Sequence, residues 1–82
     1  MESQVAVVAI IVEDPAAAGR INEILHEYGN FIIGRMGLPY REKQLSIISI
    51  MLDAPTDKIN ALAGKLGRLE HVTARAVYTG MK

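Results

Sequence analysis

The sequence predicts an α+β fold of the ferredoxin-like βαββαβ class, as a single domain over residues 1–82. Two observations predict it. Four β-rich apolar segments and two segments of helical spacing alternate in the order strand, helix, strand, strand, helix, strand. The chain also echoes itself at an offset of 38 positions, where Arg20–Asn22 matches Lys58–Asn60.

The first half of the chain is expected to hold one strand and one helix. Val5–Val12 is rich in Val and Ile and predicts a strand. Asp14 and Pro15 fit the N-cap and the first position of a helix. Gly29 follows the helical segment and fits a helix end. The apolar residues at helical spacing between them are Ala17, Ile21, Ile24, Leu25 and Tyr28.

The next two strands are expected over Phe31–Leu38 and Leu45–Leu52, joined by a charged hairpin loop. Residues 53–56 fit a second helix start, and Gly67 fits its end. His71–Thr79 alternates and predicts the fourth strand. The apolar stripe of the second helix is Ile59, Leu62, Ala63 and Leu66.

Right-handed crossovers place both helices on one face of an antiparallel sheet of strand order 4-1-3-2. The two central strands are apolar on both faces, because Val5–Val12 has no polar alternation and Leu45–Leu52 has very little. A sheet with one face in water alternates apolar and polar residues. We therefore expect a second copy of the chain to cover the face that the helices leave open, in a dimer or a higher oligomer.

Composition excludes several classes of partner and site. The chain has nine basic and nine acidic side chains, so its formal net charge is zero. A neutral chain with dispersed basic residues is not expected to bind nucleic acid directly. It has no cysteine, which excludes disulfides, thiolate nucleophiles and zinc sites built on cysteine.

No membrane segment or secretory signal is expected. Val5–Val12 is the longest apolar run near the N-terminus and is far shorter than the roughly 20 residues of a spanning helix. The only charge before it is Glu2, whereas a secretory signal opens with basic residues. These features predict a cytoplasmic protein.

No catalytic or metal-binding constellation emerges from the residues. His26 and His71 have no second ligand at metal spacing in their own elements, so no metal or other cofactor is expected. Asp14 is explained as an N-cap, with Glu13 beside it. No Ser-His-Asp arrangement is visible. Gly34 and Gly37, within a strand, suggest a bulge or a close approach by another backbone or a ligand.

A ligand- or partner-binding site between subunits is expected around Arg35, with Met36, Gly37 and Tyr40 beside it. Regular alternation places Arg35 on the face without helices, and likewise Arg75 of the fourth strand. These are the two outer strands, about 14 Å apart, so one small anion cannot touch both arginines of one copy. Two interpretations stay open: Arg35 serves a binding site, or it pairs with an acid of a neighbouring subunit.

With these elements placed, four stretches closely resemble the small ACT-like regulators of the iron-only hydrogenase system. The resemblance covers roughly residues 4–79 and is most specific in the segment Ile33–Tyr40. The stretches are Asn22–Gly29, Ile32–Tyr40, Ser46–Ile50 and Asp53–Asp57.

The resemblance implies a stand-alone ACT-like domain that associates into oligomers and regulates, as a transcriptional regulator or through a partner, in anaerobic bacteria. The chain departs from two better-understood relatives. Amino-acid-binding ACT domains have a glycine in the turn that is Val12–Pro15 here, where none is present. The nickel-responsive relative uses several histidines and a cysteine.

Three functions remain after these steps. The first is a non-enzymatic ACT-like regulatory or sensor module. The second is an oligomerisation or protein-interaction domain without a small ligand. The third is a small dimeric α+β-barrel enzyme, since one fold hosts unrelated functions. Such an enzyme needs a cavity between sheet and helices lined by polar or aromatic residues, and this sequence offers Ile, Leu and Val at those positions.

Overall fold

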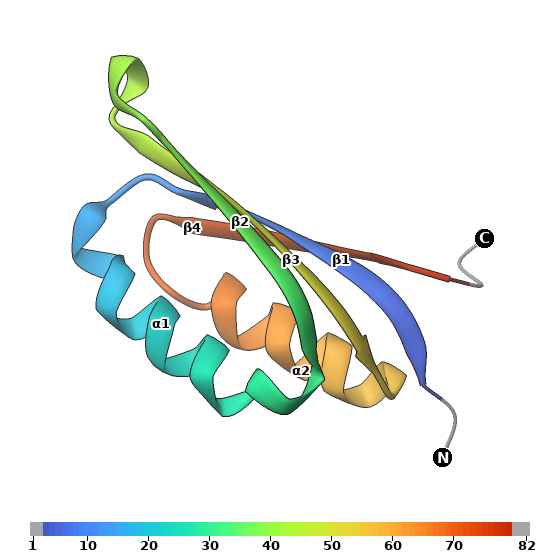
Figure 1. Ribbon diagram of the computed structural model, residues 1–82. Coiled ribbons are helices and arrows are strands. Elements are labelled where there is room, and N and C mark those ends of the chain that lie inside the picture. Colours follow the sequence, from blue (N-terminus) through green and yellow to red (C-terminus); the bar gives the residue numbers. More distant parts are fainter. Residues whose placement is uncertain (1–2, 80–82) are drawn as a thin grey trace.

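The predicted βαββαβ order is confirmed by the computed structural model, which describes residues 3–79 (Figure 1). Within that range, neither helix has the length and apolar character that crossing a bilayer requires. In chain order the elements are β1 (Gln4–Val12), α1 (Ala18–Glu27), β2 (Ile32–Tyr40), β3 (Leu45–Ala54), α2 (Thr56–Gly67) and β4 (Val72–Tyr78).

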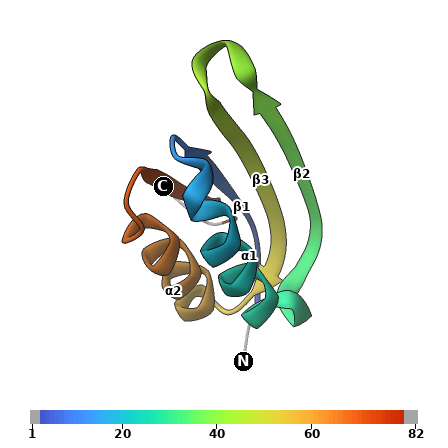
Figure 2. The ribbon, with the colours of Figure 1, turned by 90° about the vertical axis from the view of Figure 1, so that its left-hand side faces the viewer.

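The four strands form one antiparallel sheet of order β2-β3-β1-β4, which is the predicted order read from the other edge. Both helices lie on the same side of this sheet (Figure 1). The hairpin between β2 and β3 extends beyond the helices (Figure 2). Strands β1 and β3 are central, and β2 and β4 form the edges.

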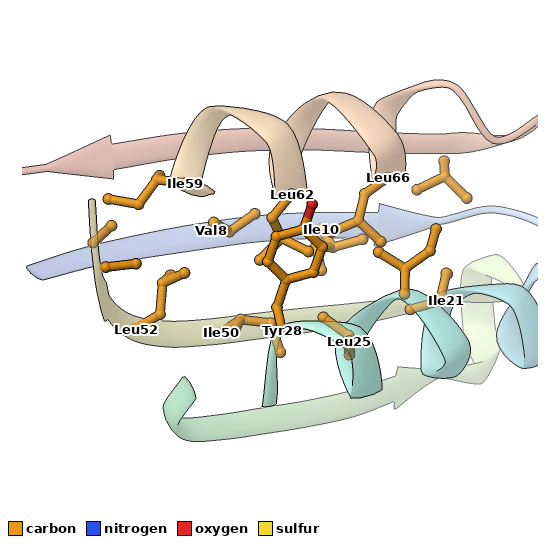
Figure 3. Close-up of a cluster of buried hydrophobic side chains, with 14 of the residues drawn as sticks. Val8, Ile10, Ile21, Leu25, Tyr28, Ile50, Leu52, Ile59, Leu62 and Leu66 are labelled. Carbon is orange, nitrogen blue, oxygen red and sulfur yellow. The ribbon is translucent and has the colours of Figure 1, made fainter. Parts of the chain in front are cut away.

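The core lies between the sheet and the helices (Figure 3). Alternate residues of β1 and β3 point toward the helices, and they are paired across the two strands as Val8 with Ile50 and Ala6 with Leu52. The helices add their apolar stripes to the same layer. No polar side chain is buried among the described residues. The core residues of the helices are Ile21, Ile24, Leu25, Tyr28, Ile59, Leu62 and Leu66.

Asp14 is the predicted N-cap, and its Oδ1 accepts a hydrogen bond from the Ala16 N–H at 2.9 Å. The segment that it caps begins as a 3-10 turn over Pro15–Ala17, and α1 follows from Ala18. At the other end Tyr28 is the C-cap, and Gly29 opens a second 3-10 turn. The helix start and end are therefore close to the predicted positions, and each adjoins a tighter turn than expected.

The second helix begins without a side-chain cap, because Pro55 occupies the capping position. Asp57 lies in its first turn, where a carboxylate favours the positive end of the helix dipole. Gly67 is the last helical residue, followed by the C-cap Arg68. The left-handed backbone that a helix-ending glycine often supplies is found later, at His71, whose φ is 62°.

Strand β2 is the element that differs most from expectation. It begins at Ile32, because Phe31 belongs to the preceding 3-10 turn, and it extends to Tyr40. Its pairing with β3 shifts between Ile32 and Gly34, so Ile33 is an extra residue in a β-bulge. A bulge was one of the two interpretations that Gly34 and Gly37 suggested within this strand. The bulge sets which residues of β2 face the helices.

Candidate functional site

The face of the sheet opposite the helices is open and apolar. Met36 and Val77 have relative exposures of 68% and 65%, and Ile47 in the middle of β3 is 38% exposed. Ile33, in the bulge, is also exposed. Apart from Ile33, every exposed large hydrophobic side chain in the described part of the chain lies on this open face. They are Val5, Val7, Met36, Leu38, Tyr40, Ile47 and Val77.

Charge is sparse on this open face. The register pairs Asp53 with Val5 and Arg75 with Ala9, so both charged side chains project from the same side as the exposed hydrophobics. They have opposite signs, and the rest of the strand positions on that side are apolar or carry Ser, Thr or Gly. The open face is therefore close to neutral.

The predicted site residues fall into two groups. Met36 pairs with Ser49, Tyr40 with Leu45, and Arg75 with Ala9, which puts all three on the open face. Arg35 pairs instead with Ile50, a core residue that faces the helices. Gly37 is two positions further along the same strand, so it belongs to the helix-facing row with Arg35. The five residues do not share one face of a single copy.

The expectation that Arg35 lies on the open face is wrong, and the bulge at Ile33 is the physical reason. Alternation counted from Phe31 assigns Arg35 to the side opposite Ile32. The extra residue breaks that count, so Ile32 and Arg35 pair with Leu52 and Ile50, which face the same way. Every side chain of β2 after the bulge is reversed relative to regular alternation from Phe31.

Arg35 instead reaches toward helix α1. Its Nη2 donates a hydrogen bond to Asn22 Oδ1 at 3.3 Å. The two residues border a pocket of about 230 Å³ between the N-terminal part of α1 and strands β2 and β3. The pocket is lined by Val12, Pro15, Ala18, Ile21, Asn22, Arg35, Ser46 and Ile48.

The remaining polar candidates stay apart from one another. His26 is exposed on α1, and His71 lies in the turn before β4, where its carbonyl accepts a hydrogen bond from the Glu13 N–H at 2.8 Å. Ser49 donates to the Met51 Sδ at 3.9 Å on the open face. Across residues 3–79, no three His, Asp or Glu side chains gather closely enough to hold a metal ion.

Sequence reasoning missed Asn22 and Ser46 as neighbours of Arg35. The sequence placed Asn22 in the first helical segment and Ser46 in the third strand, with nothing to bring either residue beside Arg35. The available signal was the pair of glycines within the strand, Gly34 and Gly37, because glycine in a strand suggests a bulge or a close approach by another group. A one-residue shift before Arg35 would have turned this side chain toward the helix and toward both residues.

Comparison with known proteins identifies the family. A family model described as "Iron-only hydrogenase system regulator, putative", the TM1266-like family, matches residues 4–76. The structure of the uncharacterized protein TM1266 from Thermotoga maritima is 34% identical, with a TM-score of 0.90, covering 95% of this chain and 99% of that one. None of the curated proteins matches the chain.

More distant structures share the fold. A nitrogen regulatory PII-like protein, CPII from Thiomonas intermedia K12, bound to ADP, AMP and bicarbonate, has a TM-score of 0.57 and 17% identity, covering 95% of this chain and 92% of that one. The same protein bound to ADP, AMP and acetate has a TM-score of 0.53 and 16% identity, covering 99% and 94%. The extent of the family match and the identity to TM1266 establish that this chain belongs to the TM1266-like family of iron-only hydrogenase system regulators.

Proposed function

We propose that this chain is a non-enzymatic regulatory module of the iron-only hydrogenase system that acts as a homo-oligomer. The apolar open face of the sheet carries the proposal. Exposed apolar patches of this continuity are typical of interaction surfaces. The chain belongs to a family described as regulators, and its fold is shared by a nitrogen regulatory protein.

The open face is large enough for a stable contact. Four strands at ~4.8 Å spacing and about nine residues at ~3.3 Å rise span roughly 19 by 30 Å, or about 570 Å² of flat surface per copy. Two copies together would bury about 1,100 Å² of flat sheet surface, just below the ~1,200–2,000 Å² of specific interfaces, and the area of the projecting side chains adds to this value.

A second copy is the partner that the charges of this face favour. The charged side chains of this face are Asp53 and Arg75. When two copies pack face to face about a two-fold axis, Asp53 and Arg75 of each copy point toward the open face of the other copy. Met36 and Tyr40, from the predicted site, then belong to the contact between subunits. A dimer through this face and a tetramer built from such dimers both satisfy the proposal.

The interior supports a binding role over a catalytic one. The centre of the layer between sheet and helices, where a barrel-type enzyme of this fold holds its cavity, is filled by apolar side chains such as Ile10, Ile50 and Leu62 (Figure 3). CPII, which shares the fold, binds nucleotides and bicarbonate, and this supports the idea that a small ligand modulates the module.

Sedimentation equilibrium of the wild type and the variant Ile47→Lys tests the assembly. The wild type is expected to sediment as a dimer or tetramer, and the variant, with a charge in the centre of the open face, as a folded single chain of 9.0 kDa. Ala61→Lys, at an exposed position of α2, is the control and should assemble normally. A monomeric wild type at micromolar concentration contradicts the proposal.

Regulation is tested by disrupting the gene in its host and measuring hydrogenase transcripts and activity. Loss of the chain should change at least one of them, and Ala61→Lys should restore it while Ile47→Lys should not. Unchanged hydrogenase output contradicts the regulatory proposal even if assembly is observed. That outcome would favour a protein-interaction domain, which the same open face would also serve.

A further inference from the structure

The pocket beside Arg35 has the composition of a binding site for a small amphiphilic anion. Its floor is apolar, formed by the buried Val12 and Ile21 and the half-buried Ile48. Arg35 is its charged residue, and Asn22 and Ser46 add polar groups at the edge. Ligand sites in proteins commonly combine an apolar lining with a few polar groups that fix orientation.

Two of the three hollows that share residues with the pocket have basic but no acidic side chains, and the third, which shares only Asn22, is lined by Glu23 and Glu27 as well as Arg20. Toward the hairpin, a hollow of about 170 Å³ shares Val12, Pro15 and Ser46 with the pocket and adds Arg41. Along α1, another of about 300 Å³ shares Asn22 and Arg35. Among the described residues, no Asp or Glu lines the pocket itself or these two hollows. In a chain with equal numbers of acids and bases, this local imbalance favours an anion.

Arg35 retains donors for such an anion. A guanidinium has five N–H donors. In the described structure, the side-chain partner of Arg35 is Asn22, and no carboxylate lies within ion-pair distance. The hydrogen bond to Asn22 holds the arginine beside the pocket and leaves its other N–H groups free to bind a carboxylate through two parallel hydrogen bonds.

We propose that this pocket binds a short aliphatic carboxylate, with the carboxylate on Arg35 and the hydrocarbon chain over Val12, Ile21 and Ile48. The volume of about 230 Å³ lies below the ~300–1,000 Å³ of sites for drug-sized ligands, so the ligand is small. An amino acid fits less well, because the lining offers its ammonium group no carboxylate. The site lies within one copy, so it does not depend on the proposed assembly.

Titration of the full-length protein with straight-chain carboxylates from acetate to octanoate, followed by amide and arginine NMR shifts, tests the proposal. Saturable shifts are expected at Arg35 and the Asn22 side chain. Affinity should rise roughly fourfold per added CH₂ until the pocket is filled, because each buried CH₂ contributes about that factor. Hexylamine, which has six carbon atoms like hexanoate but carries a positive charge, should not bind there.

Two variants separate this pocket from other surfaces. Arg35→Met removes the charge and should weaken hexanoate binding at least tenfold, the usual effect of losing a charged hydrogen bond. Ala18→Phe, at the exposed rim, should block the pocket. Their matched controls are Arg68→Met, at the exposed C-cap of α2, and Ala61→Phe, at an exposed position within α2, and both should bind like the wild type.

Three results would overturn the proposal. One is the absence of saturable shifts up to the solubility limit of octanoate. Another is unchanged binding in Arg35→Met, which is exposed and expected to fold, so its result decides even if Ala18→Phe does not fold. The third is a set of shifts centred on Met36, Leu38 and Val77, which would place the hydrocarbon chain on the open face instead.

Discussion

The Arg35 guanidinium on the edge strand β2 donates a hydrogen bond to the Asn22 side chain on α1, at 3.3 Å. The contact joins residues thirteen positions apart and links the sheet edge to the helix layer. It exists because the bulge at Ile33 turns Arg35 toward the helices. Both side chains are exposed, so the contact positions the arginine more than it stabilises the fold.

A double-mutant cycle on this pair should give a small coupling energy. Asn22→Ala and Arg35→Met are each expected to change the free energy of unfolding by less than about 1 kcal/mol, with a coupling of about 0.5 kcal/mol, because exposed polar contacts compete with water. Urea unfolding of the two single variants and the double variant measures it. A coupling above about 2 kcal/mol would show that the pair is shielded from water.

Ile50→Ala and Ile47→Ala should separate the two faces of β3. Ile50 is fully buried under the helices, so its truncation is expected to destabilise the fold by about 2–5 kcal/mol at every protein concentration. Ile47 is on the open face, so its truncation should weaken assembly, and the melting temperature should then depend more on protein concentration. If both variants lost the same amount of stability at every protein concentration, the assignment of Ile50 to the core and Ile47 to an assembly surface would be contradicted.

The order of elements, the strand order and the buried stripes of the helices could all be predicted from the sequence, because they follow from the local spacing of apolar residues. Val5–Val12 and the residues around Ile50 are apolar on both faces, and that pattern correctly indicated that the face without helices is apolar. The prediction of which β2 side chains face the helices was wrong, because the extra residue Ile33 reverses the orientation of every later side chain in the strand. Gly34 and Gly37 suggested a bulge or a close approach in this strand, but not that Ile33 is the residue left unpaired.

The contacts around the candidate pocket could not be predicted in the same way. Asn22, Arg35 and Ser46 come from three elements, and their meeting depends on how α1 is placed over β2 and β3. No local pattern encodes that placement. The left-handed residues Gln44 and His71 were also missed, because Gln does not mark such a conformation and His, although enriched in it, adopts it in only a small share of cases.

Removing the cap of the first helical segment should destabilise the protein modestly. Asp14→Ala loses the hydrogen bond from the Ala16 N–H and is expected to lower the free energy of unfolding by about 1 kcal/mol. Asp14→Asn keeps an acceptor oxygen and should recover most of the loss. Chemical unfolding of the three proteins checks this order, and equal stability of all three would contradict the capping role.

Glycine at the two left-handed positions should stabilise the fold. Gln44, with φ 56°, ends the hairpin turn, and His71, with φ 62°, precedes β4. A side chain in this region carries roughly 1–2 kcal/mol of strain, partly offset by the greater flexibility of glycine when unfolded. Gln44→Gly and His71→Gly should each therefore gain about 0.5 kcal/mol in thermal unfolding. A loss at His71 alone would show that its exposed imidazole makes a stabilising contact.

Deletion of Ile33 tests whether β2 keeps its pairing with β3 when the bulge residue is removed. Ile32 and Gly34 already pair with consecutive residues of β3, Leu52 and Met51, so their direct linkage leaves every later side chain on its present face. Ile33 is 66% exposed, so little core contact is lost. The deletion should therefore change the free energy of unfolding by about 1 kcal/mol or less, in the range of exposed substitutions.

Deletion of Met36 is the matched comparison, because it removes a residue from the regular part of the same strand. Every later residue of β2 then shifts by one position, which turns Leu38 and Tyr40 toward the helices and Pro39 toward the open face. This variant should lose more stability than the Ile33 deletion and should assemble poorly, since two side chains of the open face are withdrawn. Urea unfolding and sedimentation of both deletions measure the difference, and a greater loss on deleting Ile33 would show that the bulge itself stabilises the sheet edge.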